Sequence, residues 1–238
     1  ALGFTQFSFH PAMSFFTTPG VSASIWLALK TGLIATIFSL LCCFIILTGL
    51  MHDSGFSLLR RTLAALVAVP HSAIAIGLVF LLAPSGWLMR ILSPGITGFD
   101  SPPDWSLVPD PYGWVLIFGL MAKEIPFLLM VSLAAIATLP VRQFEQIANS
   151  LGYGRVAAWA TLILPLIYRQ IRLPVLAVLV FSLSVVDMAL LLAPTLPPPL
   201  AILVLHGFLD ADLNARLSAS FGAILQIALA IIGIGIWY

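Results

Sequence analysis

The chain of 238 residues is 61% hydrophobic and only 8% charged, with a formal net charge of +1. Soluble domains usually carry about 25% charged residues, so this composition indicates an integral membrane protein. The sequence contains no basic cluster with interleaved aromatic residues, which excludes a protein that binds nucleic acid.

Five segments are long and apolar enough to cross a membrane, since a bilayer core about 30 Å thick requires about 20 apolar residues of helix. They are Ser24 to Leu50, Leu63 to Ala83, Tyr112 to Thr138, Pro174 to Ala193 and Leu217 to Tyr238. None shows the alternation of a strand, and backbone polar groups in lipid must be satisfied within a helix. We therefore predict an all-α bundle of five transmembrane helices in a single domain, residues 1–238.

The connections between these segments differ in charge. The first and third contain most of the arginines: Arg60, Arg61, Arg142, Arg155, Arg169 and Arg172. The second and fourth are rich in proline and aspartate. Because cytoplasmic loops hold the excess of Lys and Arg, we expect the first and third connections to be cytoplasmic and the other two external. The stretch Ala1 to Gly20 is then an external link, and we expect at least one earlier span of a longer chain before it.

The first span contains three residues that need an explanation. Lys30 lies near its outer end, and we expect its side chain to extend to the membrane interface. Cys42 and Cys43 are adjacent, so they lack the spacing of a disulfide framework or of a metal site. We interpret both cysteines as residues that face lipid or pack between helices.

Prolines and a histidine mark the second and third spans. We expect Pro70 and Pro126 to bend their helices. His71 has two open interpretations: it gates or binds, or it forms a hydrogen bond between helices. In the external loop, Ser85 to Leu92 fits a short interfacial helix with Ser85 as its N-cap, although a plain loop packed on the bundle fits as well.

Three ionisable residues lie within predicted spans, Lys123 and Glu124 in the third and Asp187 in the fourth. A charge at the membrane centre costs about 2.5–3.5 kcal/mol on the insertion scale, so each needs a partner, water or neutralisation. Two interpretations remain open. Either Glu124 or Asp187 lines a translocation pathway, or Lys123 pairs with one of these carboxylates and holds helices together.

The third connection, residues 139–173, is too long for a passive link. Gly152 and Gly154 divide it into a short helix from about Val141 to Leu151 and a second helix from about Arg155 to Arg169 that leads into the next span. A short helix lying across the cytoplasmic face exposes polar residues to water or to a partner: Arg142, Glu145, Gln146 and Asn149.

This connection resembles the EAA loop of permease subunits in binding-protein-dependent ABC importers. The loop of that family carries Glu-Ala-Ala, a glycine four residues after the second alanine, and Leu-Pro further on. Here the corresponding residues are Gln146, Ile147, Ala148, Gly152, Leu164 and Pro165. The second alanine, the glycine and the Leu-Pro pair match. The glutamate position holds Gln146, with Glu145 one residue earlier, and Ile147 replaces the first alanine.

A narrower resemblance comes from three stretches: VPHSAIAIGLVFLLAPSGW, AKEIPFLL and SLSVVDMALLLAPTLPPPLAILVL. They look like the fused permeases of the ferric-iron and thiamine type, in which one polypeptide carries two bundles. The chain is similar to one half of such a protein, and the second bundle is either fused to it or separate.

The resemblance implies a multi-pass protein of the bacterial cytoplasmic (inner) membrane, with a coupling helix seated on a dimer of cytoplasmic ABC ATPase subunits. The coupling residues would be Arg142, Glu145, Gln146, Ala148, Asn149, Gly152 and Pro165. Gly152 would allow a turn with positive φ, and Ala148 would allow close approach of the ATPase. The resemblance also implies an extracytoplasmic solute-binding protein as a partner. ATP and magnesium would bind to the ATPase. This chain itself would bind no cofactor.

No catalytic constellation, metal-ligand spacing or phosphate-binding loop is present in the sequence, so we predict a permease subunit rather than an enzyme. A secondary transporter or channel without an ATPase remains an alternative, because Glu124, Asp187 and Pro126 fit ion coupling or a broken helix. Acidic external loops favour a cationic substrate only weakly, since topology alone produces them.

Overall fold

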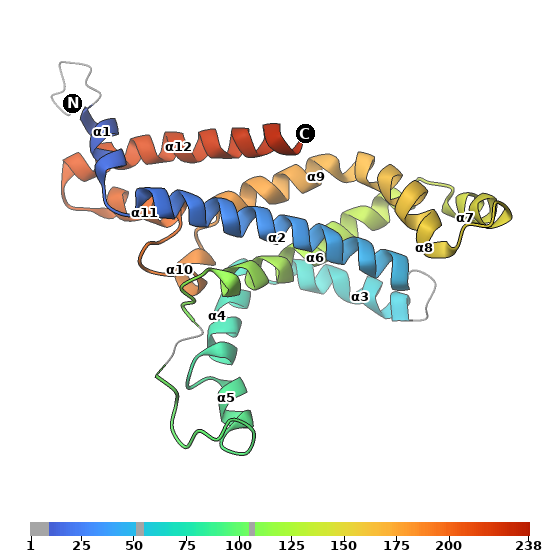
Figure 1. Cartoon of the computed structure of the whole chain (residues 1–238), viewed down its shortest axis with the longest axis horizontal. Helices are drawn as coiled ribbons and strands as arrows, with labels where there is room; N and C mark the ends of the chain where they lie inside the picture. Colours follow the sequence, from blue (N-terminus) through green and yellow to red (C-terminus); the bar gives the residue numbers. More distant parts are fainter. Residues whose placement is uncertain (1–9, 51–54, 105–107) are drawn as a thin grey trace.

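The computed structural model describes residues 10–50, 55–104 and 108–238, and every regular element among them is a helix (Figure 1). The prediction of an all-α protein is confirmed. Four long helices lie alongside one another along the length of the molecule: α2 (Val21–Leu50), α6 (Trp114–Ile136), α9 (Leu164–Ser184) and α12 (Leu213–Trp237).

Five helical segments of the described chain are long and apolar enough to cross a membrane, as predicted. Their bounds are Val21–Gly49, His71–Leu92, Trp114–Ile136, Arg155–Ser184 and Leu213–Trp237. The segment Trp114–Ile136 is the most enclosed, with 61% of its most apolar stretch buried. Close packing between the spans depends on small residues. Gly32 of α2 lies against Leu183 of α9, where an added Cβ would come within 2.8 Å of the leucine side chain.

The second predicted span, Leu63 to Ala83, is wrong as a single helix. The structure divides it into α3 (Gly55–Ala68) and α4 (His71–Leu82), and the chain continues into α5 (Trp87–Leu92). Pro70 causes the break because it lacks a backbone N–H and disfavours the helical region at the preceding residue. Pro126, by contrast, stays inside the continuous helix α6.

Helices α4 and α5 project away from the four long helices (Figure 1). Only 17% of the most apolar stretch of this segment is buried. The expected short helix at Ser85 to Leu92 exists as α5, but its N-cap is Gly86, without a side-chain hydrogen bond, rather than Ser85. Trp87 and Ile91 are exposed, as expected for an interfacial helix.

The fourth predicted span, Pro174 to Ala193, has both boundaries wrong. The helix starts far earlier, because α8 (Arg155–Ala158), the π-helical turn η1 (Trp159–Ile163) and α9 follow one another without a break. It ends earlier too, at Ser184, and a short helix α10 (Ala189–Leu192) follows. Asp187 is therefore an exposed residue in the turn between α9 and α10 rather than part of a long helix.

Two further helices occupy segments that the sequence analysis treats as links. Helix α1 (His10–Thr17) packs on α12, with Phe15 buried against Gly222. Helix α11 (Leu200–Leu209) lies within the second proline-rich connection and begins directly after Pro199. Proline is well tolerated at the start of a helix, since the N–H that it lacks has no partner in the first turn.

The first and third connections lie at the same end of the molecule. Arg155, at the start of α8, donates from Nη2 to the carbonyl oxygens of Thr48 (2.7 Å) and Gly49 (3.2 Å) near the end of α2. At the opposite end, Lys30 donates to the carbonyl oxygen of Tyr112 at 3.0 Å and lies 5.2 Å from the ring of Trp114. This arrangement agrees with the predicted alternation of the connections, and the assignment of one end to the cytoplasm stays a prediction.

Candidate functional site

A short amphipathic helix, α7 (Val141–Ser150), lies at the end of the molecule where the first and third connections meet (Figure 1). The predicted helix from Val141 to Leu151 is therefore confirmed within one residue. Arg142, Gln146 and Asn149 are exposed on α7, and Ala148 is buried with 6% of its surface exposed. The position of Ala148 differs from our expectation, because its side chain faces the protein rather than an outside partner.

The end of α7 is fixed by two backbone hydrogen bonds. The N–H of Tyr153 donates to the carbonyl of Ala148, and the N–H of Gly152 donates to the carbonyl of Asn149, both at 3.0 Å. This pair of bonds is the Schellman arrangement, which places the residue after the helix in the left-handed region. Gly152 has φ of +83°, as predicted from its position. Only glycine occupies this region without strain.

Glu145 has a different environment from the exposed one that the sequence suggests. It is half-buried, and its Oε1 accepts a hydrogen bond of 2.7 Å from Nε1 of the fully buried Trp159. Arg155 binds the last carbonyls of α2 in the same region. These contacts connect α7 and α8 to the helices of the bundle, so a displacement of α7 is opposed by bonds to η1 and α2.

Pro165 stands at the start of α9, directly after the π-helical turn η1. A proline inside a continuous helix normally clashes with the carbonyl four residues earlier, here that of Thr161. The turn before it is wider, because the N–H of Leu164 donates to the carbonyl of Trp159 five residues earlier, and this wider turn leaves room for the ring. The helical segment formed by α8, η1 and α9 therefore continues through Pro165 without a break.

Lys123 of α6 is buried and donates from Nζ to three carbonyl oxygens at the end of α3. The acceptors are Val69 at 2.6 Å, Val67 at 2.7 Å and Leu66 at 3.4 Å. The last carbonyls of a helix have no partner within it, and a cation there also opposes the negative end of the helix dipole. The pairing of Lys123 with Glu124 or Asp187 that the sequence suggests is not formed in the described structure.

Glu124, the neighbour of Lys123, faces two other helices. Its Oε2 accepts a hydrogen bond of 2.7 Å from Ser39 of α2, and its Oε1 accepts one from Ser182 of α9. The carboxyl group thus joins α2, α6 and α9 at one buried point. Both serines are fully buried, which makes such bonds costly to lose.

A cavity of about 240 Å³ adjoins these two residues. It is lined by Val67, His71, Lys123, Glu124, Phe127, Ala177, Val178 and Phe181. The ring of His71 lies 4.7 Å from that of Phe181, centroid to centroid. Three of the four candidate pathway residues therefore meet at one cavity, whereas the fourth, Asp187, lies in the turn after α9.

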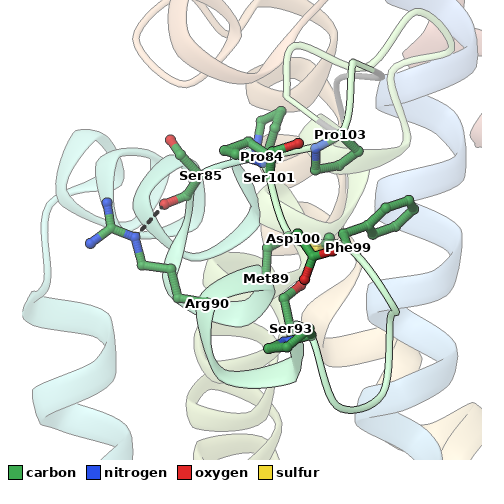
Figure 2. Close-up of a pocket in the computed structure, with 11 residues that line it drawn as sticks. Pro84, Ser85, Met89, Arg90, Ser93, Phe99, Asp100, Ser101 and Pro103 are labelled. Atoms are coloured by element: carbon green, nitrogen blue, oxygen red, sulfur yellow. Dashed lines mark hydrogen bonds between the residues drawn. The ribbon is translucent and has the colours of Figure 1, made fainter.

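A second cavity, of about 310 Å³, lies in the connection after α4 (Figure 2). Its walls are mostly proline and serine residues with Met89 and Phe99, and Asp100 points into it. Arg90 is turned aside, because its Nε donates to the carbonyl of Ser85 at 2.8 Å. The cavity therefore presents a carboxylate in a proline-rich loop at the predicted external side.

The chain is similar to a known membrane transport protein. The inner membrane ABC transporter permease protein YnjC of Escherichia coli strain K12 is 27% identical to it over 214 residues. The matched region covers 90% of this chain but only 40% of that relative. No family model matches the chain. With the five apolar helices, this similarity supports a transmembrane permease component and a multi-pass inner membrane protein, as the sequence analysis predicts.

Several residues at these sites were missed in the sequence analysis. Ser39 and Ser182 are the partners of Glu124, Trp159 is the partner of Glu145, and Arg155 caps α2. The predicted helix start at Arg155 is confirmed, and only the contact of its side chain with the end of α2 was missed. The serines carried no signal, because small hydroxyl residues are common in membrane helices and their partners lie far away in sequence.

Proposed function

We propose that this chain is a permease component of an ABC import system, in which α7 couples the bundle to a cytoplasmic ATPase dimer. The observation that carries this proposal is the geometry of the third connection. A short amphipathic helix ends in a left-handed glycine turn, and α8 and η1 continue from it into a membrane span. The similarity to an ABC transporter permease over nearly the whole chain supports it.

The exposed surface around α7 has the composition of a protein interface. Besides Arg142, Gln146 and Asn149, it carries apolar side chains that are more than half exposed: Ile147, Leu151, Tyr153 and Val156. Apolar and aromatic residues surrounded by polar ones are typical of the centre of an interface. The contacts of Glu145 and Arg155 would pass a displacement of this surface to η1 and α2.

The assignment to a group of permeases rests on the resemblance to fused permeases of the ferric-iron and thiamine type. The chain spans 40% of the length of its relative, a share that leaves room in that protein for a second bundle. We propose that a second bundle, fused or separate, completes the pathway, and that a solute-binding protein docks on the proline-rich connections. A cationic substrate fits the external Asp100, though the substrate class depends on the binding protein.

Photo-crosslinking in native membranes tests the coupling. A photoreactive amino acid at the exposed position Gln146 should crosslink a nucleotide-binding subunit that also copurifies with the protein. The same group at Ser22, exposed at the opposite end of α2, is the matched control and should not crosslink it. Crosslinking at Ser22 alone would place the ATPase at the wrong end.

The alternative is a secondary transporter or channel, for which Glu124 would be the coupling residue. The same preparation decides between them. Solute uptake by membranes in which no nucleotide-binding subunit crosslinks or copurifies, and which continues without ATP, would replace the import proposal with this alternative.

A further inference from the structure

A cavity of about 360 Å³ lies between α9 and the end of α12, apart from the two sites described above. It is lined by Tyr168, Arg169, Arg172, Leu176, Trp237 and Tyr238. Three of its four lining residues on α9, Tyr168, Arg169 and Arg172, lie in the first half of that helix, on the side of the third connection. The cavity is therefore at the predicted cytoplasmic end of the spans.

Aromatic side chains build its walls and are held by hydrogen bonds. Nε1 of Trp237 donates to Oη of Tyr168 at 2.8 Å. Nη1 of Arg172 donates to Oη of Tyr238 at 3.2 Å, and the guanidinium lies 5.4 Å from the centre of the same ring. Tryptophan and tyrosine are enriched at the level of lipid headgroups, where one side of the ring is apolar and the other wet.

The charge of the cavity is positive. Its two arginines are accompanied by no acidic side chain among the six lining residues. Arg169 is exposed and forms no hydrogen bond or ion pair with any described residue, and Arg172 uses one of its five donors on Tyr238. Guanidinium groups with free donors match the oxygens of a phosphate, often through two parallel hydrogen bonds.

An apolar surface continues from the charged one. Leu176 lines the cavity, and the neighbouring Leu173 is 68% exposed on α9. A ligand that satisfies both surfaces carries a phosphate next to a hydrocarbon chain. Basic pockets between transmembrane helices on the cytoplasmic side are known to take anionic lipid headgroups.

We propose that this cavity binds the headgroup phosphate of an anionic phospholipid from the leaflet on the side of α7. The proposal requires only that α9 and α12 cross a bilayer, so it does not rest on ABC import. Arg169 and Arg172 bind the phosphate, Trp237 and Tyr238 position them at the interface, and the acyl chains lie along Leu173 and Leu176.

Native mass spectrometry of the full-length protein, titrated in detergent with phosphatidylglycerol or phosphatidylcholine, tests this. We expect tighter binding of phosphatidylglycerol. The double variant Arg169→Gln, Arg172→Gln should lose this preference, by about fivefold for each arginine removed, since a basic residue near an anionic lipid contributes about 1 kcal/mol. The matched control, Arg61→Gln with Arg142→Gln, removes the same charge from exposed positions outside the cavity and should keep the preference.

Three results would overturn the proposal. The first is equal binding of the two lipids by the unmodified protein. The second is an equal loss of the preference for phosphatidylglycerol in the double variant and the control. The third is full displacement of phosphatidylglycerol by millimolar inorganic phosphate. The last result would make free phosphate the ligand. If the double variant does not fold, Arg169→Gln alone still decides, because Arg169 forms no bond with the described structure and its loss should still lower the preference about fivefold.

Discussion

Two breaks in the helical chain are held in place in different ways. The break between α7 and α8 depends on local bonds, since Tyr153 and Gly152 donate to carbonyls five and three residues earlier. The break between α3 and α4 depends on Lys123, which reaches carbonyls 54 to 57 residues away in sequence. The first break forms a motif of its own, whereas the second begins at Pro70 and leaves carbonyls that a side chain of α6 satisfies.

The difference has a physical basis in the membrane. Carbonyls at the end of a helix need donors, and inside a bilayer water does not supply them. Where a break lies at the protein surface, the backbone and water satisfy these groups. Where it lies between spans, a side chain from another helix must do so. Gln226 of α12 does this at the end of α9, because its Nε2 donates to the carbonyl of Leu183 at 3.0 Å.

The largest effect is expected from Gly152→Val, which breaks the local turn. A β-branched residue at φ of +83° is strained by about 1–3 kcal/mol, and an added Cβ meets no atom within 4 Å that would compensate. We expect α7 to lose its fixed end, so that hydrogen–deuterium exchange of its amides rises. Binding of the ATPase subunit should fall by about tenfold or more, as a cost of this size implies.

Gly154→Val is the matched control for this variant. Gly154 has φ of −68° and also meets no atom within 4 Å at an added Cβ, so valine fits there without strain. Exchange in α7 should stay as in the unmodified protein. Similar exchange in both variants would show that the left-handed turn is not required.

The locality of these bonds explains what the sequence reveals. The break between α7 and α8 was predicted because two closely spaced glycines, Gly152 and Gly154, indicate it in the sequence itself. The end of α3 and the early end of α9 were missed, since hydropathy is nearly uniform there and the stabilising donors are Lys123 and Gln226 on distant helices. For the same reason one of the two open interpretations paired Lys123 with a carboxylate: the sequence shows the acids at similar depth, but not the carbonyls at the end of α3.

A second and smaller effect is expected from Lys123→Met, which removes the donor at the long-range break. Hydrogen bonds to a charged group contribute about 1.5–3 kcal/mol each. Removing the buried charge also removes the cost of placing it in the membrane, which stabilises the variant by about 2.5–3.5 kcal/mol on the insertion scale. With two strong bonds lost, we expect a net loss of about 1.5 kcal/mol in the free energy of unfolding, measured by titration with dodecyl sulfate, and faster amide exchange in the last turn of α3.

Lys30→Met provides the comparison for this substitution. Lys30 also donates to a backbone carbonyl, that of Tyr112, but through one bond at the end of the molecule. Its loss should cost less than about 1 kcal/mol, because water can replace the donor there. An equal cost for the two methionine variants would mean that Lys123 contributes packing rather than a helix cap.

The smallest effect is expected from Gln226→Leu, which removes the donor at the end of α9. The bond to Leu183 is lost, at about 0.5–1.5 kcal/mol, and the carbonyl is left without it. The variant also removes Oε1 of Gln226, which is buried and has no hydrogen-bond partner among the described residues. These terms oppose each other, so the free energy of unfolding should change by less than about 1 kcal/mol in the same titration. Gln143→Leu, at an exposed position on α7, controls for the change in polarity. The free energy of unfolding could instead fall as much in Gln226→Leu as in Lys123→Met. A neutral donor would then stabilise a helix end between spans as much as a charged one. The charge of Lys123 would not be what distinguishes the α3–α4 break.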